Sequence, residues 1–69
     1  MKRLNQRTRL HVGDKITYRL YNTPEGRYYG DQVKATVIAI HAKQEKPIEV
    51  REVGGRTIRL HRKEIRSRE

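Results

Sequence analysis

Arginines and tyrosines are interleaved in one stretch of this chain, and they are its side chains with the clearest binding chemistry. Arg19 and Tyr21 lie two residues apart, and Arg27 is followed directly by Tyr28 and Tyr29. A guanidinium group forms paired hydrogen bonds with a phosphate, and a tyrosine ring stacks on an unpaired base. This combination indicates a surface that binds single-stranded nucleic acid. The sequence leaves open a second interpretation, in which some of these tyrosines pack in the core.

A second basic group lies near the C-terminus and comprises Arg56, Arg59, Arg62, Lys63, Arg66 and Arg68. We expect Glu49 and Glu52 to neutralise part of it by facing Arg59 and Arg56 across a hairpin. An exposed ion pair contributes only about 0–1 kcal/mol, so a phosphate can compete for such an arginine. The alternative is a solvated face without a ligand. The full set of candidate nucleic-acid-binding residues is Lys2, Arg3, Arg7, Arg9, Arg19, Tyr21, Arg27, Tyr28, Tyr29, Lys34, Arg59, Arg62, Lys63 and Arg66.

Positive charge dominates the whole chain, since 17 Lys and Arg against 8 Asp and Glu give a formal net charge of +9. Such a field attracts polyanions. We therefore predict a module that binds RNA or DNA mainly through phosphates, with limited sequence specificity. The main alternative is a small regulatory module that docks on an acidic surface of a nucleic-acid-processing machine. A charge that serves only solubility is a weaker explanation, because acidic residues serve solubility as well.

The chain offers little for catalysis or metal binding. It has no Cys, and the positions of His11, His41 and His61 match no zinc-ligand spacing. A third class of function, a tiny ribonuclease, would use His61 for acid–base chemistry, but nothing nearby in the sequence supplies a second acid–base partner. We therefore predict a protein that is not an enzyme and has no catalytic residues, metal or cofactor.

The segments that must position these residues have the sequence patterns of β-strands. Ile16, Tyr18 and Leu20 alternate with polar residues, which is the pattern of a strand with one buried face, and we expect Tyr18 in the core. A turn follows at residues 22–26, and Gly30 with Asp31 forms another break. Residues 33–42 are rich in β-branched side chains and predict a central strand in a tightly curved sheet.

A hairpin is predicted between residues 47 and 62. A two-residue loop at Gly54 and Gly55 would set apolar residues opposite polar ones. A three-residue loop, residues 53–55, instead pairs Val50 with Ile58 and Ile48 with Leu60 on one face. Glycine at position 55 can adopt the left-handed conformation that closes such a loop. A tight turn through residues 62–64 would then bring Ile65 onto the core.

This layout resembles the SH3-like small barrels of KOW, Tudor and related nucleic-acid-associated modules, over about residues 12–67. The residues that carry the resemblance are Val12-Gly13-Asp14 with Ile16 where the barrel begins, residues 33–40 as the central strand, residues 50–60 as the hairpin, and Lys63-Glu64-Ile65 at the last corner. It implies an all-β fold, a small barrel of about five antiparallel strands. The absence of Trp and Phe argues against a methyl-lysine cage.

The domain organisation follows from these elements. We expect a basic, flexible arm over residues 1–11 and a single domain over residues 12–69. The longest apolar run, residues 37–40, is far shorter than the roughly 20 residues of a membrane span, so we expect a cytoplasmic protein without a membrane partner. An exposed edge strand could pair two copies, which allows a monomer or a weak homodimer.

Overall fold

The structure is a computed structural model, and it describes residues 2–3 and 9–69. Candidate residue Arg7 lies outside this part of the chain. The elements in chain order are β1 (Lys2–Arg3), β2 (Lys15–Asn22), β3 (Arg27–Ile40), β4 (Ile48–Glu52), β5 (Thr57–Leu60), the 3-10 turn η1 (Arg62–Glu64) and β6 (Ile65–Arg68).

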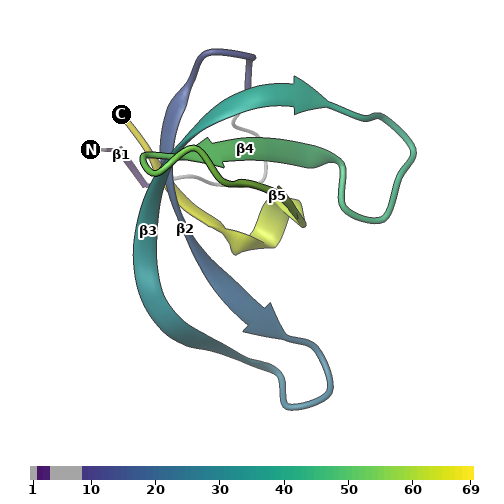
Figure 1. Cartoon of the computed structure of the whole chain (residues 1–69). Helices are drawn as coiled ribbons and strands as arrows, with labels where there is room; N and C mark the ends of the chain where they lie inside the picture. The colour runs from purple at the N-terminus through teal and green to yellow at the C-terminus, as the bar shows by residue number, and fades with distance from the viewer. Residues whose placement is uncertain (1, 4–8) are drawn as a thin grey trace.

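The strands form one antiparallel sheet in the order β1-β6-β2-β3-β4-β5. Five of them, β2 to β6, make up the body of the sheet, and the two-residue β1 pairs with β6 beside it. The long β3 bends strongly, so that the β2–β3 hairpin extends in one direction and the β3–β4 connection in another (Figure 1). The predicted all-β fold of about five antiparallel strands is confirmed. Barrel closure is not detected, because no recorded pairing within residues 2–3 and 9–69 joins β5 to β1 or β6.

The β4–β5 hairpin has the register that the sequence predicted. Val50 lies opposite Ile58 and Ile48 opposite Leu60. The Gly55 amide donates to the carbonyl of Glu52 at 2.9 Å, and Gly55 has a φ of +94°. The apolar partners therefore select the three-residue loop, because the other register would bury polar side chains.

The sequence suggested a break in the chain at Gly30 and Asp31. In the structure, β3 instead runs from Arg27 through both residues without interruption. Its pairing with β2 shifts here, because Tyr18 lies opposite Val33 whereas Leu20 lies opposite Tyr29. Gly30 has a φ of +75°, which glycine adopts without a side-chain clash. The glycine therefore allows a bulge that bends the strand without ending it.

The core lies on the inner face of the bent sheet. Its fully buried side chains are Ile16, Val37, Val50 and Leu60, and Tyr18 is buried beside them, as predicted. Ile65 reaches the core after the turn through Arg62–Glu64, also as predicted. Leu10 belongs to the same cluster, although the sequence placed it within the basic arm. Leu10 is one of the few aliphatic residues in that arm, and its burial fixes the chain just before β2.

Membrane-spanning helices were sought in the described residues, and no helix there has both the length and the apolarity to cross a bilayer.

Candidate functional site

The alternation of side chains along β2 separates a buried inner face from an outer face. Ile16 and Tyr18 point into the core, so Lys15, Arg19 and Tyr21 lie on the opposite face. The strand pairings carry this face across the sheet and add Tyr28, Lys34, Thr36 and Arg51. We use the name outer face for these residues together with Lys63 and Arg66, whose side chains reach the same tyrosines.

Two tyrosines and two cations form a compact cluster at one end of the outer face. The rings of Tyr21 and Tyr28, which lie opposite each other on β2 and β3, meet edge to face with their centroids 4.9 Å apart. Lys63 Nζ lies 4.6 Å from the centroid of the Tyr21 ring, and the guanidinium carbon of Arg66 lies 4.2 Å from that of Tyr28. The Tyr28 hydroxyl donates to the carbonyl of Lys63 at 2.9 Å. The structure thus brings together four of the predicted site residues, which come from both basic groups.

A buried carboxylate underlies this cluster. Glu64 is only 3% exposed, and its two oxygens accept the backbone amides of His61 at 2.8 Å and Tyr21 at 3.0 Å. These bonds attach η1 to β2, and they therefore fix the position of Lys63 relative to the Tyr21 ring. Glu64 did not stand out in the sequence, because its partner Tyr21 lies 43 residues away in the chain.

A depression of about 500 Å³ lies at the other end of the outer face. The cations Lys15, Lys34 and Arg51 line it, together with Thr36 and Ile38. Two acidic residues, Glu52 and Glu69, also contribute to its lining. The side chain of Glu52 accepts a hydrogen bond from the buried Tyr18 hydroxyl, which draws its negative charge toward the inner face.

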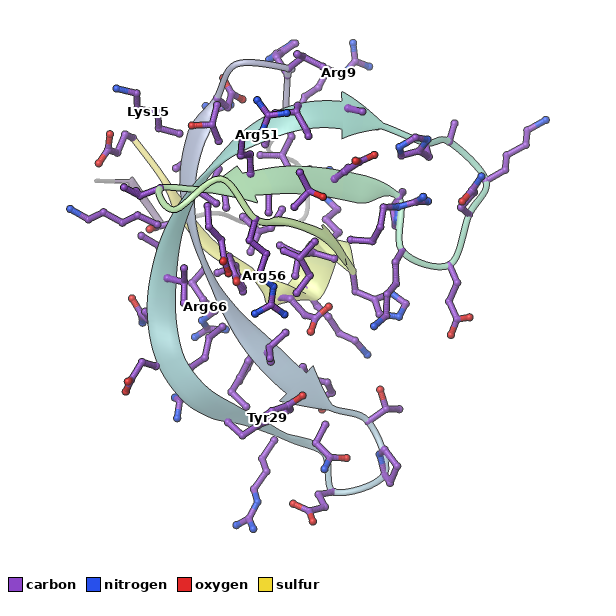
Figure 2. The ribbon with its side chains drawn as sticks, in the orientation of Figure 1. Arg9, Lys15, Tyr29, Arg51, Arg56 and Arg66 are labelled. Atoms are coloured by element: carbon purple, nitrogen blue, oxygen red, sulfur yellow. The ribbon has the colours of Figure 1, made fainter. Side chains whose placement is uncertain are left out.

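The two ends of the outer face are well separated. Lys15 and Tyr21 are six residues apart on β2, which corresponds to about 20 Å along a strand. Lys15 and Arg51 lie together at one end of the sheet, whereas Arg66 lies nearer the β2–β3 turn (Figure 2). Lys15 and Arg51 were absent from the sequence-based set. The alternation of β2 could have found Lys15, which shares a face with Arg19. Placing Arg51 on the face of Lys34 needs the pairing of β3 with β4.

Several predicted site residues have a structural role or lie elsewhere. Arg19 donates to the carbonyl of Gly30 at 2.8 Å, which supports the bulge in β3. Arg27 pairs with Glu25 at 3.2 Å in the β2–β3 turn, away from the depression. Arg59 donates to the Lys46 carbonyl at 2.9 Å and to the Gln44 side chain, so it holds the loop between β3 and β4.

The remaining candidates are dispersed. Tyr29 lies opposite Leu20 and so faces away from the outer face, with 49% of its surface exposed. The backbones of Lys2 and Arg3 pair with Arg68 and Ser67. Arg9 is exposed, and its carbonyl accepts a hydrogen bond from Arg68. Arg62 is half-buried at the start of η1.

The acidic residues of the β4–β5 hairpin have other partners than the sequence suggested. Glu49 lies opposite Arg59 in the register, but its carboxylate contacts His41 Nε2 at 2.7 Å. Glu52 lies near Arg56 at the end of the hairpin, but its carboxylate accepts the Tyr18 hydroxyl. Burial, reinforced by this hydrogen bond, raises the pKa of Tyr18 from 10.0 to about 12.

The histidines lie apart from one another and next to single carboxylates. His11 is 3.9 Å from Asp14, and His61 is 3.9 Å from Glu45. Within residues 9–69, no group of three or more His, Asp and Glu side chains is placed to hold a metal ion.

Comparison of the chain with protein-family models, with curated proteins and with solved structures finds no match.

Proposed function

We propose that this protein binds nucleic acid through the outer face of its sheet. The observation that carries the proposal is the convergence of Lys15, Lys34, Arg51, Lys63 and Arg66 on this face from β2, β3, β4, η1 and β6. Cations gathered along one face of a strongly positive protein attract a phosphate backbone and release its counterions. The contacts are to phosphates, so sequence specificity is limited.

The fold itself supports a finer proposal, an SH3-like small barrel. The last strand, β6, pairs with the first long strand, β2, so both ends of the domain meet in one sheet. A 3-10 turn separates β5 from β6, and the bulged β3 takes part in two hairpins. These features agree with the SH3-like resemblance of residues 12–67. Such folds carry many functions, so the proposed function is based on the outer face and not on the fold.

A charge-matched pair of double variants tests the proposed function. The site variant carries Lys15→Gln and Lys34→Gln, and the control carries Lys43→Gln and Lys46→Gln in the exposed loop between β3 and β4. Both lose two positive charges. We expect the site variant to reduce the slope of log affinity against log salt by about 2, in fluorescence anisotropy with labelled RNA and DNA.

The control should change that slope by less than half as much, since a distant charge acts only through the screened field. Equal effects of the two variants would show that only the net charge matters and would contradict a site on the outer face. An absence of binding to RNA and to DNA at about 50 mM salt would overturn the proposed function itself.

A second candidate function is docking on an acidic protein surface. The specific observation in its favour is apolar surface next to the cations, because Val53 is 92% exposed and lines the same depression as Ile38. Exposed apolar groups surrounded by charge are typical of protein interfaces. A partner that stays bound after nuclease treatment and is lost in Val53→Ser would support docking, whereas nuclease-sensitive capture would support nucleic acid.

A further inference from the structure

The tyrosines of the outer face have little free ring surface. Lys63 covers one face of Tyr21, and Arg66 covers one face of Tyr28. The two rings also meet edge to face at an interplanar angle of 67°, so the edge of one ring occupies a face of the other. Both residues are half-buried. The ring that contributes its edge keeps one uncovered face, so the pair does not offer two adjacent open rings on which successive bases could stack.

Proteins that bind single strands without sequence preference depend on open aromatic faces. Each stacked base contributes about 1–3 kcal/mol in such proteins. The most exposed tyrosine, Tyr29, is opposite Leu20 on the other side of the β2–β3 hairpin and cannot serve the outer face. The outer face therefore offers several cations but no run of open aromatic rings for successive bases.

The cations of the outer face form two groups, one beside the tyrosines and one around the depression. Lys63 and Arg66 form the first group, and Lys15, Lys34 and Arg51 form the second. The far ends of the two groups, at Lys15 and beside Tyr21, lie about 20 Å apart along β2. Lys34, opposite Thr17, and the backbone of Arg66, between the partners of Thr17 and Tyr18, lie nearer the middle of the strand. A duplex presents two rows of phosphates with its bases paired and stacked inside, so it can meet both groups without exposing a base.

We propose that the outer face binds a double-stranded nucleic acid, with the two groups of cations on its two phosphate rows. This inference rests on the proposed function and names its ligand class. Tyr21 and Tyr28 are then positioning residues, whose rings hold Lys63 and Arg66 in place through cation–π contact. They contribute to phosphate binding through those cations and do not contact bases.

The experiment compares nucleic acids of one sequence as duplex DNA, duplex RNA and single strands, each titrated at about 50 and 200 mM salt by fluorescence anisotropy. The proteins are the natural chain, Tyr28→Leu and Tyr28→Phe. The Phe variant retains the ring under Arg66 but loses the hydrogen bond to the Lys63 carbonyl. Thermal unfolding by circular dichroism verifies that each variant is folded. If the Leu variant is not, the comparison of duplexes with single strands in the natural chain still tests the inference.

We expect at least one duplex to bind about ten-fold more tightly than the single strands, and Tyr28→Leu to lower single-strand affinity less than about three-fold, because no base-stacking energy is lost. Duplex binding by Tyr28→Leu should show a smaller salt slope, by up to about 1, as Arg66 loses its support. Tyr28→Phe should keep the natural slope.

Two results would overturn the duplex inference and leave the proposed function standing. One is single-strand affinity equal to or above that of both duplexes. The other is a loss of about 5- to 150-fold in single-strand affinity for Tyr28→Leu with an unchanged salt slope, which is the effect of losing a stacked base. A failure to bind any of the probes would instead overturn the proposed function.

Discussion

The buried hydroxyl of Tyr18 makes the stability of the fold depend on pH. Its pKa rises to about 12 in the folded protein because burial and the bond to Glu52 favour the neutral form. The contribution of this hydroxyl to the free energy of unfolding is fully present below about pH 10, which is its pKa in the unfolded chain. The contribution is lost as the pH rises toward 12. A shift of two pKa units corresponds to about 2–3 kcal/mol.

The prediction for Tyr18 is therefore a fall in the free energy of unfolding above pH 10 that is shallower in Tyr18→Phe. Urea denaturation of both proteins at several pH values from 9 to 11.5 measures it. Parallel pH curves for the natural chain and the variant would show that Tyr18 is not responsible for the alkaline loss.

Glu64 gives a second prediction at the residue scale. Its carboxylate accepts two backbone amides while almost fully buried, and such charge-assisted bonds are costly to lose. We expect Glu64→Ala to lower the free energy of unfolding by about 2–4 kcal/mol, since two donors lose their acceptor. The matched control Glu45→Ala, at an 88% exposed side chain, should change it by less than about 0.5 kcal/mol. Similar effects in urea denaturation would contradict this role of Glu64.

The β4–β5 hairpin shows how local chemistry determines an element. Its register follows from the pairing of apolar residues, which is why the sequence predicted it correctly. Gly55 has a φ of +94°, whereas Gly54 does not adopt a positive φ, and at both positions the space that a Cβ atom would occupy has no neighbour within 4 Å. The two glycines therefore differ in backbone conformation and not in available space.

The prediction for this loop is a contrast between two alanine variants. Gly55→Ala should destabilise the protein by about 1–2 kcal/mol, because an L-residue is strained in the left-handed region. Gly54→Ala should be neutral or stabilise it by up to about 1 kcal/mol, because it restricts the unfolded chain. The difference between the thermal midpoints measures this contrast, and equal midpoints would contradict the loop geometry.

Other features of the elements could not be predicted from the sequence. The bulge at Gly30 depends on how β2 and β3 bend together around the core, so the glycine looked like a strand end. The partner of Glu49 depends on the loop before β4, which brings His41 within reach. Likewise, the cations over Tyr21 and Tyr28 come from η1 and β6, about forty residues further along, and only the pairing of β6 with β2 brings them near.

At the scale of the whole molecule, the strand pairings determine which basic residues lie together and which have partners, and the composition alone does not show this. Arg27 and Arg59 have partners in the turn and loop, and Arg68 lies 3.7 Å from Asp14 near the start of β2. Lys15, Lys34 and Arg51 surround the depression, and Lys63 and Arg66 cover the tyrosines. The net charge predicted a polyanion as ligand, and the strand pairings define the surface that we propose as its binding site.

The most direct test of binding through the outer face maps the bound surface by NMR. Uniformly ¹⁵N-labelled protein is titrated with a short duplex at low salt, and amide shifts are followed residue by residue. We expect the largest changes at outer-face residues such as Lys15, Tyr21, Lys34, Arg51 and Arg66, with small changes in the loop at residues 43–46. Changes concentrated in that loop or along β5, with the outer face unaffected, would contradict it.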